Sequence, residues 1–82
     1  MLKRLLEFRF VKTVNVLYQY QNYNDKAETK YEDGSTVWIE RCFAMDIPKT
    51  GDAIIRDGYY FRVATIWHNI DENCIEVDLN DL

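Results

Sequence analysis

The chain has few of the residues that form phosphate loops, disulfide bridges or metal sites. Among its 82 residues are three glycines, one proline, two cysteines and one histidine. Three isolated glycines provide no glycine-rich phosphate-binding loop, and neither a P-loop nor a GxSxG motif is present. We therefore expect no catalytic residue and no cofactor, and interpret the protein as one that is not an enzyme.

A long hydrophobic run is also missing. Residues 1–6 (MLKRLL) begin like a signal peptide, but Glu7, Arg9 and Lys12 interrupt the apolar residues and no small-residue cleavage site follows. No segment approaches the roughly 18 apolar residues that cross a membrane. We therefore expect a cytoplasmic protein that does not contact membranes.

The cysteines and the histidine lack the spacing of a metal site. Cys42, Cys74 and His68 are the residue types of a mixed zinc site, but CxxC and HxxxH spacings are absent. We expect no metal site and interpret the two cysteines as buried free thiols of a cytosolic protein. His68 is interpreted as a strand-end residue that is hydrogen-bonded to the following turn.

Basic residues are outnumbered, with ten Lys and Arg against 14 Asp and Glu and a net charge of −4. This balance makes nucleic acid an unlikely partner, because Lys and Arg supply most of the non-specific attraction to phosphates. Residues 1–12 hold four basic residues and one acid, whereas residues 71–82 hold five acids and no base. We expect the two ends to lie side by side as complementary strands. The alternative is a basic tip that binds a partner.

Aromatic residues, by contrast, are plentiful. Four Phe, six Tyr and two Trp make up 15% of the chain. Aromatic side chains bury large areas, so a few of them can build the core of a small domain. The length allows one domain at most, which we place at residues 1–82.

Alternating apolar and polar residues predict a series of strands. Residues 6–20 alternate, with Lys12 the only exception on the apolar face, and this pattern is typical of a long strand with one buried face. A short helical turn at residues 2–6 is an alternative start. We expect further strands at residues 36–45, 53–56, 59–68 and 75–79. In the expected strand at residues 36–45, Val37, Ile39, Phe43 and Met45 share one face and Trp38, Cys42 and Ala44 the other, so both faces are expected to be partly covered.

Two local features define the hairpins. Asp57-Gly58 suits a two-residue type I′ turn, because glycine accepts a positive φ without steric cost. Phe61 and Val63 share one face of the fourth strand, but Ile66 falls on the other. A β-bulge near Ala64 and Thr65 would bring all three to the core. Together these features predict a mainly β fold, a five-stranded antiparallel small barrel or curled sheet.

Residues 16–20 (VLYQY) are similar to the ALYDY stretch that opens eukaryotic SH3 domains. The tandem tryptophans of those domains are missing, because Trp38 and Trp67 lie far apart. In a barrel of SH3-like type the first and last strands pair. That pairing would place Arg9 and Lys12 near Glu76 and Asp78 on the solvent side.

Residues 48–79 resemble the SH3-like small barrels of short phage and bacterial accessory proteins. The shared features are a Pro, a Gly-Asp pair, an Asp-Gly turn, an aromatic-Arg-Val strand, a His and a final alternating strand. The resemblance implies a short accessory protein whose partner is another protein.

Residues 21–35 are polar, lack alternation and are expected to form a long loop, a class of segment that is often functional. Tyrosine is a rigid contact residue, and Asn and Gln add adaptable hydrogen bonds. We therefore expect a non-enzymatic protein-interaction module, such as a phage-type inhibitor or an assembly accessory protein, whose partner could be a basic nucleic-acid-binding protein. The expected partner-binding residues are Tyr20, Tyr23, Glu28, Tyr31, Glu32 and Asp33. The alternative is a hairpin tip whose tyrosines cover the end of the barrel.

Two other functions stay open. One is a nucleic-acid-binding barrel in which aromatic and basic residues of the third and fourth strands stack on bases, namely Arg56, Tyr59, Tyr60 and Arg62. The other is a structural subunit that forms a homo-oligomer, because the open edges of a small sheet invite pairing between chains.

Overall fold

The computed structural model describes residues 13–22 and 31–82. They form five strands and one short 3-10 helix: β1 (Thr13–Tyr20), β2 (Thr36–Phe43), η1 (Ala44–Asp46), β3 (Ala53–Arg56), β4 (Tyr59–Asn69) and β5 (Cys74–Asp81). The prediction of a mainly β fold with five strands is confirmed. The expected helical turn at residues 2–6 and the start of the first expected strand lie outside the described residues.

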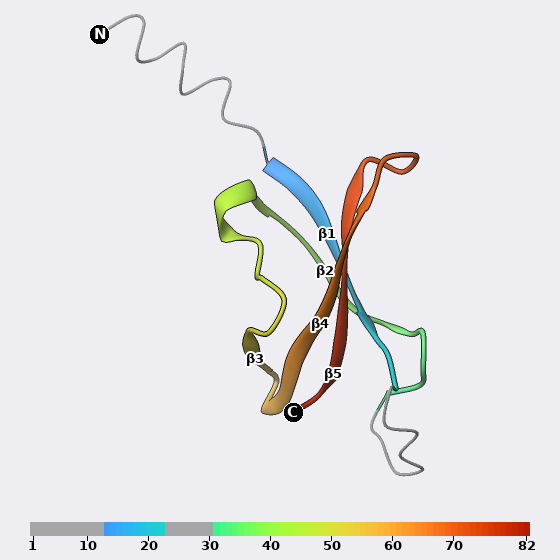
Figure 1. The fold of residues 1–82 in the computed structure, drawn as a ribbon, viewed down its shortest axis with the longest axis vertical. Coiled ribbons are helices and arrows are strands. Elements are labelled where there is room, and N and C mark those ends of the chain that lie inside the picture. The colour runs from blue at the N-terminus through green and yellow to red at the C-terminus, as the bar shows by residue number, and fades with distance from the viewer. Residues whose placement is uncertain (1–12, 23–30) are drawn as a thin grey trace, which may run out of the picture.

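The strands form one sheet in the order β2-β1-β5-β4-β3, which curls into a half-barrel (Figure 1). Three neighbouring pairs, β1–β2, β3–β4 and β4–β5, are antiparallel as expected, and β1–β5 is parallel. The expected pairing of the first and last strands is therefore confirmed. The curled five-stranded sheet is compatible with an SH3-like small barrel.

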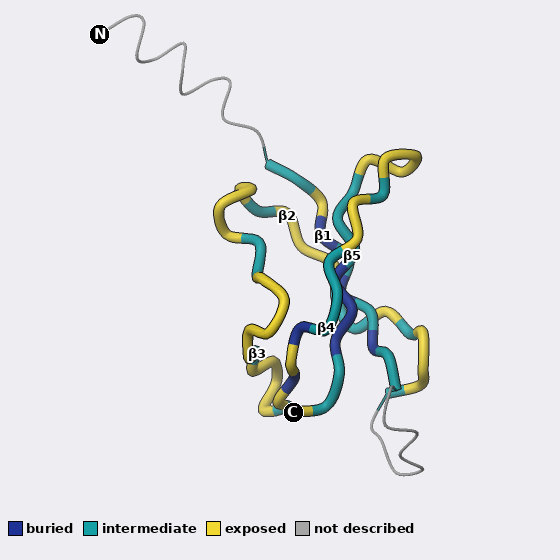
Figure 2. Tube along the Cα trace, viewed as in Figure 1, coloured by how far each residue is buried: buried dark blue, intermediate teal, exposed yellow. Residues whose placement is uncertain are grey.

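The core lies on the inner face of the curl. Alternate residues of the three central strands are buried there: Val16, Tyr18, Tyr20, Phe61, Val63, Val77 and Leu79. Figure 2 shows the buried segments gathered along the middle of the sheet. The ring of Phe61 is fully buried, and its centroid lies 4.9 Å from the ring of Tyr59 and 6.3 Å from that of Trp38. Aromatic side chains therefore supply much of the core, as the composition predicts.

Both predicted hairpin features are present. Asp57 and Gly58 have φ angles of 51° and 77°, the positive values that a type I′ turn requires at both central residues. The β4–β5 ladder shifts register between Val63 and Thr65. The extra residue keeps Ile66 packed against the same core as Val63, which is the effect expected of a β-bulge.

The second strand differs from its prediction in two ways. Residues 44–46 form η1 rather than the end of the strand. Trp38 and Cys42 of one apolar face contact the core cluster, and of the other face Val37 also packs against it. Ile39, Phe43 and Met45 are exposed, at 65%, 43% and 87% of their surface. The face is decided by the neighbouring strand, because the ring of Trp38 stacks on that of Tyr18 at 4.0 Å.

Candidate functional site

The sheet has a second face, turned away from the core. The alternation that buries one face of each strand places the intervening residues on the other. We call this second surface the outer face and define it by Ile39 of β2, Leu17 and Gln19 of β1, Glu76 and Asp78 of β5, and Trp67 and Asn69 of β4. Ile39 and Trp67 are more than half exposed.

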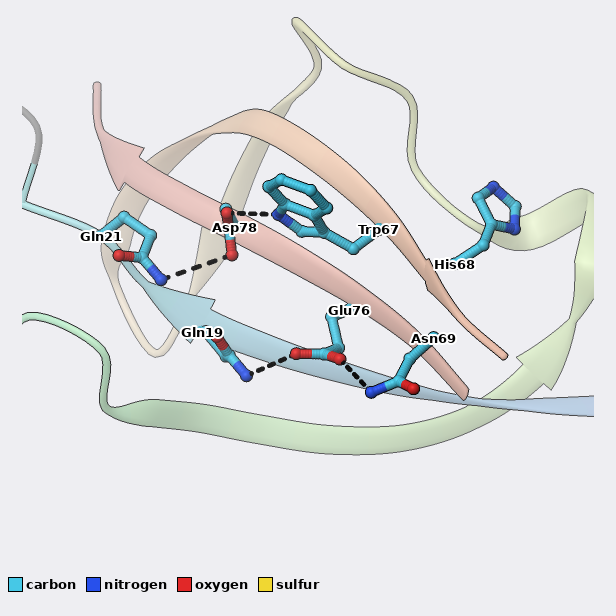
Figure 3. A pocket seen from close by; sticks show the side chains of 7 residues that line it. All are labelled: Gln19, Gln21, Trp67, His68, Asn69, Glu76 and Asp78. Atoms are coloured by element: carbon cyan, nitrogen blue, oxygen red, sulfur yellow. Dashed lines mark hydrogen bonds between the residues drawn. The ribbon is translucent and has the colours of Figure 1, made fainter. Parts of the chain in front are cut away.

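The outer face contains an open pocket of about 570 Å³, shown in Figure 3. Its lining residues are Gln19, Gln21, Trp67, His68, Asn69, Glu76 and Asp78. Two carboxylates from one strand, β5, stand beside an indole and three side-chain amides. The pocket is therefore polar and acidic, with a single large aromatic wall.

Neutral donors fix the orientation of the Glu76 carboxylate. Its Oε1 accepts a hydrogen bond of 3.0 Å from Nε2 of Gln19, and its Oε2 accepts one of 2.6 Å from Nδ2 of Asn69. Both donors are uncharged amides, so they orient the carboxylate without neutralising it. Within residues 13–22 and 31–82 the ion pair present is Arg56–Asp57, and none forms at Glu76.

The second carboxylate, Asp78, is buried, with 4% of its surface exposed. Its Oδ2 accepts a hydrogen bond of 2.7 Å from the indole Nε1 of Trp67, and its Oδ1 one of 3.5 Å from Nε2 of Gln21. Asp78 lies on the face turned away from the core, as expected, but its side chain is buried there beside its hydrogen-bond donors. The postulated partners of Asp78 and Glu76, Arg9 and Lys12, lie outside the described residues. In the pocket, the hydrogen bond to Asp78 holds the Trp67 indole in a fixed orientation.

A second cavity, of about 580 Å³, adjoins the first on the outer face. Asn69 and Glu76 line both cavities. The second cavity extends toward β2 and is lined there by Leu17 and Ile39. The outer face therefore joins an acidic, aromatic region to one in which two aliphatic side chains stand beside the polar residues Asn15 and Glu72.

Sequence reasoning missed this surface, although one signal for part of it was available. In the β4–β5 hairpin, Trp67 pairs with Glu76 and Asn69 pairs with Cys74. Both pairs follow directly from the position of the turn that joins the two strands. The predicted hairpin therefore contained the Trp67–Glu76 pair. The contribution of Gln19 was not available, because it depends on the parallel pairing of β1 with β5.

The tyrosines of the expected loop site belong to the core. Tyr20 is fully buried, and its hydroxyl donates a hydrogen bond of 2.7 Å to Asp81. The ring of Tyr31 lies 5.4 Å from that of Tyr59 and 5.7 Å from that of Phe61. These contacts favour the alternative in which tyrosines cover the end of the barrel.

The acidic part of the expected loop site is on the surface. Glu32 and Asp33 are exposed, and an oxygen of Asp33 accepts a hydrogen bond of 2.7 Å from the backbone N–H of Asn22. Tyr23 and Glu28 lie outside the described residues. Of the six expected residues, the structure therefore places two, Glu32 and Asp33, together at the surface.

The four residues of the nucleic-acid alternative lie on opposite faces. Arg56 pairs with Tyr59 across β3 and β4, and its guanidinium lies 5.0 Å from the ring centre of Trp38 on the inner side. Tyr60, which is 56% exposed, and Arg62 point the other way. The structure does not bring these residues together into one base-stacking platform.

In the described part of the chain, no three His, Cys, Asp or Glu residues are grouped so that they could hold a metal ion. Cys42 and Cys74 are free and half-buried. Burial, together with the negative charges of Glu40 and Asp46, raises the pKa of the Cys42 thiol. The thiol form is thereby favoured over the reactive thiolate.

The described residues include no helix that is long and apolar enough to cross a membrane. A scan against protein-family models, a search of the curated proteins and a search of the solved structures each found no match. What this surface binds therefore has to be inferred from its own chemistry.

Proposed function

We propose that this protein is a non-enzymatic protein-interaction module that binds a basic segment of a partner protein on its outer face. The observation that carries the proposal is the pocket around Trp67, in which an indole that is 55% exposed stands beside two carboxylates. Tryptophan is enriched among the residues that dominate binding energy at protein interfaces. Acidic groups beside it select a partner of opposite charge.

The charge of the whole chain supports a basic partner. It contains 14 Asp or Glu side chains and ten Lys or Arg side chains, a net charge of −4. Such an excess attracts basic surfaces over a distance of several ångströms and speeds association with them. A basic nucleic-acid-binding protein is a partner of this kind.

The resemblance of residues 48–79 to short phage and bacterial accessory proteins suggests what such binding would be for. A small acidic module that occupies the basic surface of a nucleic-acid-binding protein would act in the cytoplasm as an inhibitor or as an assembly accessory. Phosphate groups of nucleic acid itself are repelled by Glu76 and Asp78, so the partner is the protein.

A capture experiment tests the proposal. The wild-type protein, Trp67→Ala, Glu76→Lys and Tyr60→Ala are immobilised and exposed to a nuclease-treated lysate of the source organism. Tyr60→Ala is the matched control, because Tyr60 is an exposed aromatic residue of the same strand outside the pocket. Circular dichroism establishes that each variant is folded.

We expect the wild type and Tyr60→Ala to retain the same protein at equal yield, and both pocket variants to retain at least about tenfold less of it. Capture that depends instead on Glu32 and Asp33, shown by loss in a Glu32→Lys, Asp33→Lys variant, would move the site to the loop. Recovery of nucleic acid alone, when nuclease is omitted, would favour the base-stacking alternative.

A further inference from the structure

One row of side chains crosses the outer face from β2 to β4. Ile39 is the cross-strand partner of Leu17, Leu17 of Glu76, and Glu76 of Trp67. Because directly opposed residues of neighbouring strands point to the same face, all four side chains lie on the outer face. We call these four residues the cross-sheet row.

The two ends of the cross-sheet row differ in chemistry. Leu17 and the largely exposed Ile39 line the second cavity, and Trp67 lines the first. Glu76 stands between them and lines both. A ligand that lies along the row therefore meets a carboxylate and an indole at one end and two aliphatic side chains at the other.

We propose that the cross-sheet row recognises an extended peptide segment that carries an arginine or lysine close to an apolar residue. The inference rests on the proposed function, since it uses the same face, and it adds the chemistry of the segment that is bound. The cationic group lies between Glu76 and Trp67, and the apolar side chain packs on Leu17 and Ile39.

The state of Glu76 supports a cationic ligand. An ionised carboxylate has about four acceptor positions, and the hydrogen bonds from Gln19 and Asn69 use two of them. The remaining positions suit the N–H groups of a guanidinium or ammonium. Trp67 adds attraction, because the face of an indole binds a cation better than that of any other side chain.

The geometry of the row sets the spacing within the ligand. Neighbouring strands lie about 4.8 Å apart, so the centre of the Glu76–Trp67 pair is about 10 Å from that of the Leu17–Ile39 pair. An extended peptide advances about 3.3 Å per residue, and its side chains alternate between two sides. We therefore expect the cation and the apolar residue at positions i and i+2 or i and i+4, with the flexible stem of Lys or Arg absorbing the difference.

Selection from a display library of short random peptides tests this inference. The targets are the wild-type protein, Glu76→Gln, which removes the charge and keeps the size, and Ile39→Ser, which changes the apolar end. Ile55→Ser is the control, because Ile55 is 64% exposed but lies on β3, outside the row. Circular dichroism again establishes that the variants fold.

The wild type and Ile55→Ser should enrich the same peptides, with Arg or Lys at the stated distance from an aliphatic or aromatic residue. Those peptides should bind Glu76→Gln about tenfold more weakly. Against Ile39→Ser, selection should keep the cation and lose the apolar preference.

Peptides that need Trp67 but contain no cation, or that bind Glu76→Gln as tightly as the wild type, would overturn the inference and leave the proposed function intact. The absence of any enriched peptide would also overturn it, while a folded basic partner could still bind the face. Enriched peptides that bind the wild type, Trp67→Ala and Glu76→Gln equally would overturn both.

Discussion

Tyr18 illustrates how a single residue stabilises the packing of the inner face. Its ring is 98% buried and stacks on Trp38, while its hydroxyl donates a hydrogen bond of 2.8 Å to Glu40. Burial, the hydrogen bond and the negative charge of Glu40 raise the pKa of the phenol well above its ordinary value. Only the neutral phenol suits this environment, because an ionised oxygen would be desolvated beside a carboxylate.

The raised pKa of Tyr18 predicts a loss of stability at alkaline pH. Because the folded-state pKa exceeds the unfolded-state pKa, the phenol contributes fully below about pH 10 and its contribution is lost as the pH rises toward the folded-state value. Tyr18→Phe removes the ionisable group, so its free energy of unfolding should fall less than that of the wild type between about pH 9 and about pH 11.

Urea unfolding followed by circular dichroism at both pH values measures this difference. Tyr60→Phe is the matched control, since Tyr60 is an exposed tyrosine of the same sheet. Equal losses in the wild type and Tyr18→Phe would show that this phenol does not couple folding to pH.

Of the two loop tyrosines that the structure describes, the residue pattern could predict the burial of Tyr20 but not the position of Tyr31. The alternation in β1 already grouped Tyr20 with Val16 and Tyr18, and this pattern predicts a buried Tyr20 more directly than a binding one. The position of Tyr31 could not be predicted, because its ring contacts Phe61, a residue remote in the sequence. Such contacts depend on the curled sheet rather than on local pattern.

At the scale of the element, β4 shows how one extra residue determines which side chains lie on the inner face of the sheet and which on the outer face. Without the register shift at Val63 and Thr65, Ile66 would leave the core and Trp67 would enter it. The sequence already shows that Ile66 falls out of the alternation set by Phe61 and Val63, and for this reason the bulge could be predicted. The same bulge is what places Trp67 on the outer face.

Deletion of Ala64 should therefore remove the bulge and keep both faces, because regular alternation then puts Val63 and Ile66 on the inner face and Trp67 on the outer one. We expect the free energy of unfolding to change by at most about 1 kcal/mol. Chemical denaturation and the near-ultraviolet circular dichroism of the aromatic core measure the effect.

Deletion of Arg62 is the matched contrast, since it also shortens β4 by one residue but places the buried residues Phe61 and Val63 on opposite faces. It should cost about 3 kcal/mol or more, because a large apolar side chain leaves the core. A deletion of Ala64 that costs as much as the deletion of Arg62 would mean that the bulge is not what assigns the faces of β4.

Other features of the elements were beyond prediction for physical reasons. Strand positions and the Asp57-Gly58 hairpin follow from local pattern. The parallel direction of β5 beside β1 follows from the crossover, through η1 and residues 47–52, that carries the chain from one sheet edge to the other (Figure 1). The buried face of β2 was ambiguous because both of its faces carry apolar residues, and the stacking of Trp38 on Tyr18 decided it.

At the scale of the whole molecule, one curled sheet serves two purposes. Its inner face buries an aromatic core that makes a small domain stable, and its outer face presents an ordered arrangement of carboxylates and one indole. The hydrogen bonds of Glu76 and Asp78 hold that arrangement before any partner arrives. Preorganisation of this kind lowers the entropy cost of binding.

The central claim, that the outer face is the binding surface, is tested most directly by nuclear magnetic resonance. Isotopically labelled protein is titrated with the captured partner or a selected peptide, and the shifted signals are mapped. We expect the largest shifts at the indole N–H of Trp67 and at the side-chain amides of Gln19 and Asn69, with little change at Tyr60. Shifts confined to Glu32, Asp33 and their neighbours, with the Trp67 indole unmoved, would contradict the account.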